Sequence, residues 1–199
     1  MPHADYCLDF HTGGASRFNA PQVRIKPGDE RLLELAKVFN APFTVYSNTI
    51  EKSYRNTCQK MGIPVLLFEG GKSRESNKYI AKEGVDGILR VLKHLDMLGT
   101  RHVAPEPIAK TVIIEKSKWV RAYRSGLLHV KIDCNKHVEK GEFLATITDP
   151  YGKMRFKVTS PNEGYIINVN QSPIVNQGDA IFHISTANTA NIEDEEMED

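Results

Sequence analysis

The sequence has few cysteines, no long apolar run and no leader-like start, and each absence excludes a class of protein. Its three cysteines, Cys7, Cys58 and Cys134, lie far apart and form no Cys-x-x-Cys pair, so a disulfide framework is excluded and a reducing compartment is favoured. No apolar run approaches the roughly 18 residues of a membrane-spanning helix. Residues 1–5 lack the basic segment and apolar core of a secretory signal. These absences predict a cytoplasmic protein without a membrane partner.

Neither positive nor negative charge is in large excess, which argues against nucleic acid as a partner. The formal net charge of the 199 residues is +1 at pH 7. The last seven residues hold six acids and no base, so the rest of the chain carries about +7. Its lysines and arginines are dispersed along the chain rather than gathered in a stripe. With 40% hydrophobic and 26% charged residues, the chain has room for one large globular domain or two small ones.

Two stretches of the sequence share one design, and they are the first candidates for a site. Residues 5–14 and 62–71 each contain a short apolar run, then a chemically capable side chain, His11 or Glu69, and then two glycines. Such a run is typical of a buried strand in a parallel sheet, and ligands bind beyond the carboxyl ends of such strands. We therefore expect His11 and Glu69 at one rim, with Asp9 on the face of His11, as a metal ligand and a general base.

The remaining pattern of the first half predicts a layered α/β domain over residues 1–99. Helical spacing follows Asp29, which is a suitable N-cap. Residues 12–28 are rich in Gly, Asn and Pro and are expected to form a loop. The order of strands and helices is that of an α/β layer structure. The expected elements are helices over residues 30–39, 53–61 and 76–99 and a short strand over 43–46.

The second half changes to a period of two and predicts a small all-β domain. Residues 100–110 contain two prolines and no periodicity, so they are expected to be a linker. Beyond them, short apolar runs alternate with turn residues, and an internal quasi-repeat is present. The repeat predicts two hairpins related by a pseudo-two-fold axis, forming a barrel-sandwich over residues 111–185. Residues 186–199 are polar and acidic, and we expect a disordered tail. The matching positions are Gly126, Val138 and Gly141 in one copy and Gly164, Val175 and Gly178 in the other.

Four motifs in fixed order carry a resemblance to a known family. They are Asp9-Phe-His-Thr-Gly-Gly, Gly62-Ile-Pro before Glu69-Gly-Gly, Lys118-Trp-Val-Arg-Ala before Ser125-Gly, and Asp149-Pro before Gly152. Together, from about residue 3 to about residue 185, the chain resembles the succinylglutamate desuccinylase/aspartoacylase family. The resemblance implies zinc-dependent deacylases. Its implied fold class is α/β: the C-terminal portion of a zinc-carboxypeptidase-like layered domain, followed by a small all-β barrel-sandwich domain.

The resemblance also implies roles for the rim residues. His11 stands at the position of the family's third zinc ligand and Glu69 at that of its general base. The residues themselves allow two roles for Asp9: it orients His11 from behind, or it caps the following turn. Zinc lowers the pKa of its bound water to about 7, and a carboxylate within reach can take the water proton and return it to the leaving amine. The implied substrate is a small N-acyl amino acid or related amide. Further candidates for substrate contact are Arg17, Tyr54, Gly70 and Gly71.

One departure from the family pattern concerns the metal. The family's first two zinc ligands come from an upstream His-x-x-Glu, and none of the seven histidines of this sequence begins such a motif. Catalytic zinc normally needs three protein ligands. The sequence is therefore expected to be the C-terminal part of a deacylase that by itself binds zinc weakly and is inactive. Tyr54 is followed four residues later by Cys58, where aspartoacylase-like members have Arg, so a strictly aspartate-like substrate is not predicted.

Other functions remain open for the second half. Its quasi-repeat resembles lipoyl and biotinyl carrier domains, in which a hairpin lysine bears the cofactor, and Lys153 lies near that place. Asp149-Pro-Tyr-Gly is, however, a type I turn signature in its own right. A non-catalytic binding module is a further alternative. As part of a deacylase, the all-β domain would cover the catalytic domain, narrow the entrance to its cleft, or make the contacts of a homo-oligomer.

Overall fold

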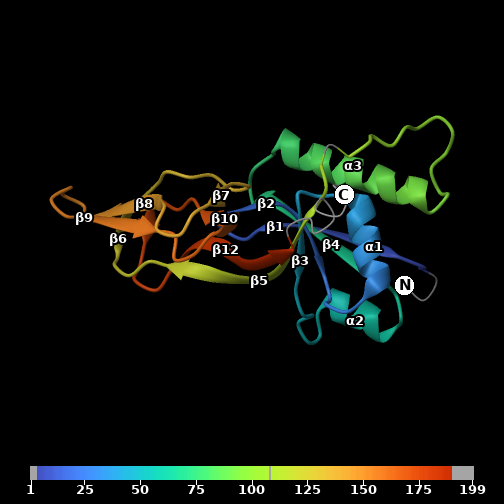
Figure 1. Cartoon of the computed structure of the whole chain (residues 1–199), viewed down its shortest axis with the longest axis horizontal. Coiled ribbons are helices and arrows are strands. Elements are labelled where there is room, and N and C mark those ends of the chain that lie inside the picture. The colour runs from blue at the N-terminus through green and yellow to red at the C-terminus, as the bar shows by residue number, and fades with distance from the viewer. Residues whose placement is uncertain (1–3, 108, 190–199) are drawn as a thin grey trace, which may run out of the picture.

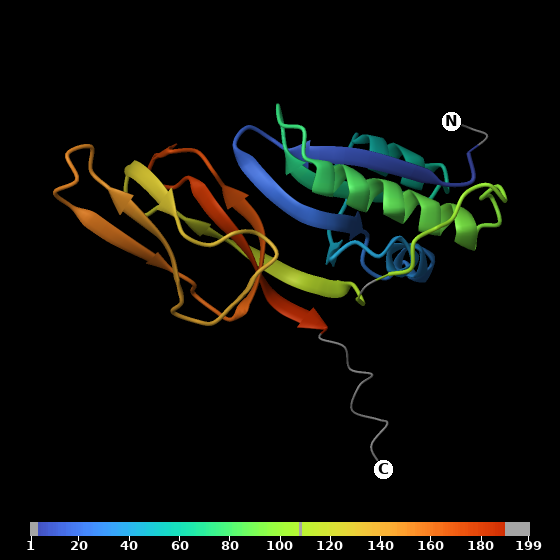
Figure 2. The ribbon, with the colours of Figure 1, turned by 90° about the horizontal axis from the view of Figure 1, so that it is seen from above.

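Strands dominate the structure, a computed structural model that describes residues 4–107 and 109–189 (Figure 1). The molecule is elongated, with the helices at one end and a small sheet at the other (Figures 1 and 2). No helix in the described residues is long and apolar enough to cross a membrane. The helices are α1 (Glu30–Phe39), α2 (Tyr54–Lys60) and α3 (Lys78–His94). The strands are β1 (Cys7–Gly13), β2 (Arg17–Ile25), β3 (Phe43–Tyr46), β4 (Val65–Lys72), β5 (Val112–Arg121), β6 (Gly126–Val130), β7 (His137–Val138), β8 (Phe143–Thr148), β9 (Arg155–Thr159), β10 (Gly164–Asn170), β11 (Ile174–Val175) and β12 (Ala180–Thr189).

One large sheet runs through both halves of the chain. Its order is β1-β4-β2-β3-β5-β12-β10-β7, and β10 also pairs with β2. β1 is parallel to β4, whereas β2 is antiparallel to β4 and parallel to β3. A second sheet of four strands has the order β11-β6-β8-β9. We call residues 4–99 the α/β part and residues 112–189 the β part. Strands of both parts therefore share the large sheet.

Helices cover both faces of the sheet in the α/β part. Successive residues of a strand point to opposite faces. In β4, Leu66 and Phe68 pack with α1 and α3, and the rings of Phe39 and Phe68 lie 5.4 Å apart. Val65 instead packs with Cys58 of α2. Accordingly, α2 and α3 lie on opposite sides of the strands in Figure 1. The side chains at positions 7, 9 and 11 of β1 and at 65, 67 and 69 of β4 therefore share the α2 face.

The local predictions for the first half hold for α1 and β3 and fail for the loop. α1 has the predicted bounds, and the backbone N–H of Leu32 donates to the carboxylate of its N-cap Asp29 at 3.1 Å. The expectation of a loop over residues 12–28 was wrong, because β2 occupies most of that segment. Pro21 lies between Asn19 and Gln22, where the register of β2 shifts against β4. A proline that sits at a bulge is compatible with a strand, and this local signal hid β2 in the sequence.

Two element ends also differ from the predictions. The helix expected to end at Gly99 ends at His94, because Asp96 adopts a left-handed backbone conformation with φ of 56°. Residues 186–189 of the expected tail belong to β12, because its pairing with β5 continues to Thr189. The remainder of that tail, residues 190–199, lies outside the described residues.

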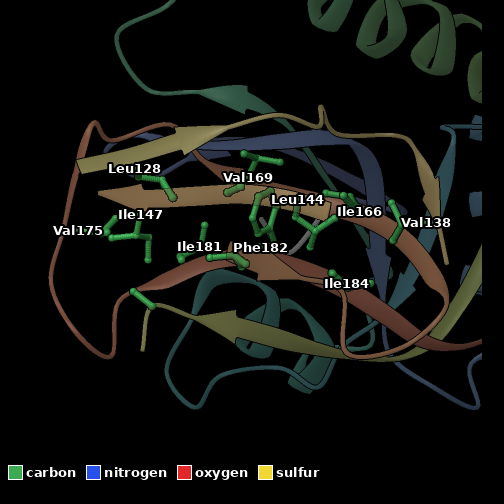
Figure 3. Packing of buried hydrophobic residues seen from close by; sticks show 13 residues of the cluster. Leu128, Val138, Leu144, Ile147, Ile166, Val169, Val175, Ile181, Phe182 and Ile184 are labelled. Atoms are coloured by element: carbon green, nitrogen blue, oxygen red, sulfur yellow. The ribbon is translucent and has the colours of Figure 1, made fainter. Parts of the chain in front are cut away.

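In the quasi-repeat of the β part, the short strand of each copy pairs with a strand of the other copy. The short strand β7 pairs with β10, and its counterpart β11 pairs with β6. At equivalent positions, a Cβ on Gly126 would lie 2.3 Å from the carbonyl oxygen of Thr148, and one on Gly164 would lie 2.2 Å from that of Ser185. Both glycines are therefore required by the close approach of a neighbouring strand. Figure 3 shows the core between the sheets, which includes Leu144, Ile166 and Phe182.

Candidate functional site

The carboxyl ends of β1 and β4 bring His11 and Glu69 side by side. The two strands are parallel, and the Cα atoms of His11 and Glu69 are partners in the register. Both side chains lie on the α2 face, but α2 covers only the beginning of that face, where Cys58 packs near Cys7 and Val65. The far end is open, and the side chain of His11 is 51% exposed. The sequence prediction that these two residues meet at one rim is therefore realised in the geometry.

Asp9 lies directly behind His11. The Nε2 atom of His11 is 3.0 Å from Oδ2 of Asp9, which is two residues earlier on the same face of β1. A carboxylate that accepts from one ring nitrogen fixes the orientation of the ring and leaves the other nitrogen, here Nδ1, with its lone pair outward. This arrangement is suited to a neutral imidazole that serves as a metal ligand.

Two donors converge on one oxygen of Glu69. Nδ2 of Asn19 donates to Oε2 at 3.0 Å, and Nη2 of Arg24 lies 3.2 Å from the same oxygen. Both partners come from β2, the strand that the sequence did not reveal. The Glu69 side chain is 17% exposed, and its other oxygen, Oε1, has no bond to the described part of the chain. Glu69 is thus an ion-paired, oriented carboxylate with one oxygen left for chemistry.

The β part reaches the same place through β10 and β12. Asn168 of β10 donates from Nδ2 to Oδ1 of Asn19 at 2.5 Å. Next to it in the register lies His183 of β12, whose ring stacks on Trp119 with 4.4 Å between centroids and 6° between planes. Cross-strand partners project from the same face of a sheet. A row of side chains therefore crosses four strands and ends at Glu69. Its members are Trp119, His183, Asn168 and Asn19.

Two arginines, Arg24 and Arg55, lie near the Glu69 end of this row. Arg55 of α2 donates to the backbone carbonyl of Arg24. Burial, and then the charge of Arg24, lower the pKa of Arg55, whereas the charges of Glu69 and Asp9 raise it. Burial, and then the charge of Arg24, lower the pKa of His183 from 6.5 to about 4. The imidazole of His183 is therefore neutral at pH 7, and the guanidinium of Arg24 is the cation closest to Glu69.

Two other predicted site residues, Arg17 and Tyr54, make no hydrogen bond or ion pair with His11 or Glu69 in the described part of the chain. Arg17 sits at the start of β2 with its guanidinium 5.8 Å from the Trp119 ring centroid. The hydroxyl of Tyr54 is 3.2 Å from Sγ of Cys7, four residues before His11 and about 13 Å away along β1 at the usual rise. Hydrogen bonds to the Cys7 and Cys58 thiols raise the pKa of Tyr54.

Gly70 and Gly71 are both buried beneath α3. A Cβ on Gly70 would lie 2.7 Å from the Ile80 side chain, and Gly71 has a φ of 67°. Helix packing and backbone conformation therefore account for both glycines.

Sequence reasoning missed Asn19, Asn168 and Arg55, and it did not identify Arg24 as a partner of Glu69. Arg24 is only 23% exposed and is paired. The sole signal available was the apolar alternation around Val23 and Ile25, which Pro21 interrupts. For Asn168 no local signal exists, because its partner Asn19 is 149 residues away.

The described residues supply only part of a zinc site at this rim. His11 offers one nitrogen, with Asp9 behind it, whereas catalytic zinc normally has three protein ligands. Within residues 4–107 and 109–189, the one group of three metal-capable side chains is His137, Glu139 and Glu163. All three are exposed and belong to the β7–β10 edge of the β part, so they do not complete the site at His11.

The comparisons with known proteins give a family match for the α/β part of the chain. Residues 1–95 match the model of the Succinylglutamate desuccinylase/Aspartoacylase catalytic domain. The resemblance to this family is confirmed. A search of the curated proteins found no significant match. The matched region contains β1, β2 and β4, and so it includes His11, Asn19, Arg24 and Glu69.

Solved structures extend the likeness to nearly the whole chain. A succinylglutamate desuccinylase/aspartoacylase from Rhodobacter sphaeroides is 26% identical, covers 92% of this chain and superposes with a TM-score of 0.78. The ectoine utilization protein EutE (DoeB) from Ruegeria pomeroyi is 22% identical over 94% with a TM-score of 0.79. An aspartoacylase family protein from Mesorhizobium loti is 15% identical over 94% with a TM-score of 0.72. The last two likenesses concern the fold, and together the three confirm a mixed α/β fold. This chain spans 58%, 61% and 65% of their respective lengths.

Proposed function

We propose that this chain forms part of a zinc-dependent deacylase that removes an acyl group from a small N-acyl amino acid or related amide. The observation that carries the proposal is the in-register pairing of His11 with Glu69 at an open strand end, inside the region that matches the family's catalytic domain. The substrate class rests on the family match. Two cations lie near Glu69: Nη2 of Arg24 is 3.2 Å from its carboxylate, and the charge of Arg55 interacts with it.

Each rim residue has a defined task in this proposal. Nδ1 of His11, with the ring held by Asp9, supplies one metal ligand. Zinc, when bound, supplies a Lewis acid for the amide carbonyl and lowers the pKa of water. Glu69 accepts a proton from the attacking water on Oε1 and passes it to the leaving nitrogen as the carbon–nitrogen bond breaks. The water oxygen ends in the carboxylic acid, and the proton ends on the released amine.

The proposal includes the finer fold and domain assignment. Residues 1–99 would be the C-terminal portion of a carboxypeptidase-like layered domain, residues 100–110 a linker and residues 111–185 a β barrel-sandwich domain. Two further zinc ligands would come from the length of the relatives that this chain does not span. None of the three cysteines, all of which are described by the structure, forms a disulfide bond, which is consistent with the proposed cytoplasmic location.

The decisive experiment compares this chain with the longest open reading frame that contains it. We expect the 199-residue chain to hold far less than one zinc per molecule and to hydrolyse no N-acetyl or N-succinyl amino acid. The longer protein should hold one zinc and hydrolyse at least one of them. In the longer protein, His11→Ala should lose zinc and activity together. Glu69→Gln should retain zinc and lose about 10²- to 10⁴-fold in kcat.

Three outcomes would count against the proposal. Tight stoichiometric zinc in the short chain would show that its ligands lie elsewhere. A Glu69→Gln enzyme with unchanged kcat would remove the general base. An intact mass of the purified protein that shows a lipoyl or biotinyl adduct on Lys153, which is exposed between β8 and β9, would favour the carrier reading.

A further inference from the structure

The β part is bonded to Glu69 through two asparagines. β10 lies antiparallel to β2, with Asn168 opposite Asn19 in the register. The Asn168 side chain donates to Oδ1 of Asn19 at 2.5 Å, and Nδ2 of Asn19 donates to Oε2 of Glu69 at 3.0 Å. Asn19 and Asn168 are 4% and 3% exposed. A continuous chain of hydrogen bonds therefore runs from the β part to the proposed general base.

The direction of these bonds fixes the orientation of the middle amide. An asparagine side chain has an acceptor side and a donor side, and rotating it by half a turn exchanges them. The bond from Asn168 to Oδ1 of Asn19 and the bond from Nδ2 of Asn19 to Glu69 both require the same orientation of the middle amide. Without Asn168, Oδ1 of Asn19 would lose its buried donor, and the amide would be held only by its bond to Glu69.

The carboxylate is thereby held on one oxygen and left free on the other. Asn19 and Arg24 both act on Oε2, whereas Oε1 has no bond to the described residues. A general base needs a lone pair that is available and correctly aimed, and small misplacements of a catalytic group reduce rates strongly. The donor set on Oε2 provides both conditions.

We propose that Asn168 is a positioning residue: through Asn19 it fixes the Glu69 carboxylate, so that the β part belongs to the catalytic device. The functional meaning of this role rests on Glu69 being the general base, whereas the orientation of Asn19 can be measured in the chain as it stands. The β part then contributes the final restraint on a residue almost a hundred positions earlier in the chain, in addition to any role as a cover.

A side-chain NMR experiment on the 199-residue chain tests the orientation directly. In the unchanged chain, the Asn19 NH₂ group should be rigid, with an order parameter near the backbone value of about 0.85. In Asn168→Ala, it should fall below about 0.6. The matched control is Asn170→Ala on the same strand. Asn170 bonds to the backbone of Ala180 and Ser172, so its loss should leave the Asn19 signal unchanged.

An isosteric change covers the case in which Asn168→Ala does not fold. Asn168→Asp keeps the shape but places a carboxylate oxygen against Oδ1 of Asn19. The Asn19 amide should then turn its NH₂ group toward the new carboxylate, and its nuclear Overhauser contact with Glu69 should disappear. A rigid Asn19 NH₂ group that stays on Glu69 in Asn168→Ala or in Asn168→Asp would overturn the proposal.

Kinetics in the longer, zinc-loaded protein separate positioning from mere stability. Asn168→Ala should lower kcat about 10- to 100-fold with KM changed by less than about twofold, because the loss falls on the transition state. Asn170→Ala should change neither constant. Equal losses in the two variants would contradict the proposal. If no hydrolysis exists to measure, the proposed function fails, and the NMR result alone decides whether Asn168 orients Asn19.

Discussion

Replacing His183 should remove a large part of the acid sensitivity of the fold. Its ring is stacked on Trp119, and its Nδ1 atom is buried without a hydrogen-bond partner among the described residues. Burial, and then the charge of Arg24, lower its pKa from 6.5 to about 4. The unfolded chain keeps the ordinary value, so between pH 6.5 and 4 it binds more protons than the folded chain. Stability therefore falls as the pH falls through this window.

The size of the effect follows from the two pKa values. One pKa unit corresponds to about 1.4 kcal/mol, so the difference between 6.5 and about 4 amounts to about 3 kcal/mol. This is a large fraction of the stability of an ordinary domain, about 5–15 kcal/mol. The contribution is present in full above pH 6.5 and is lost by about pH 4. Carboxylates add their own acid dependence, which a comparison between variants removes.

Urea unfolding of three proteins at several pH values measures the effect. His183→Phe keeps a ring against Trp119 but cannot bind a proton, so between pH 7 and pH 4 it should lose about 3 kcal/mol less than the unchanged chain. His129→Phe is the control, because the His129 ring is exposed and bonded to Thr148. It should follow the unchanged chain. If the free energy of unfolding fell equally with pH in all three proteins, the conclusion that His183 is a buried neutral imidazole would be refuted.

Three substitutions test the packing of the α/β part by urea unfolding. Gly87→Ala should lose about 1–2 kcal/mol, because its Cβ would lie 2.3 Å from the buried Phe39 ring, and overpacking outweighs the helix propensity of alanine. Gly84→Ala should leave the free energy of unfolding unchanged or raise it by up to about 1 kcal/mol, because the ring that its Cβ meets, Phe10, is 44% exposed and can move. Equal losses of stability in Gly84→Ala and Gly87→Ala would contradict the predicted clash with Phe39. Gln22→Met should gain about 1–2 kcal/mol, because both polar atoms of this buried amide lack a partner among the described residues; a loss would show that the amide is satisfied.

The part of the site that could be predicted lies at the ends of two strands. His11 and Glu69 each follow a short apolar run and precede glycines, a pattern that depends only on neighbours in sequence. The parallel pairing of the two runs then follows from the α/β order of elements. Asp9 was found for the same reason, since positions two apart on a strand share a face.

The remaining partners of Glu69 depend on pairings that no local pattern encodes. Arg24 and Asn19 lie on β2, where Pro21 and the bulge interrupt the alternation by which strands are recognised. Asn168 becomes relevant only because β10 pairs with β2, and the pair is 149 residues apart in sequence. Register between such distant strands is decided by the whole fold, so these residues became visible only in the structure.

Removing the β part should therefore disrupt the α/β part as well. Residues 1–110 retain β2 and β3 but lose β10 and β5, their partners in the large sheet. The same cut exposes a fully buried cluster in which Phe43 and Ala20 pack against Ile114 and Ile167. Unpaired strand edges with apolar side chains promote aggregation. We expect this fragment to be insoluble or to unfold without a cooperative transition in urea. A soluble fragment with cooperative unfolding would show that the shared sheet is dispensable, and would remove the structural basis for a β part that positions Glu69.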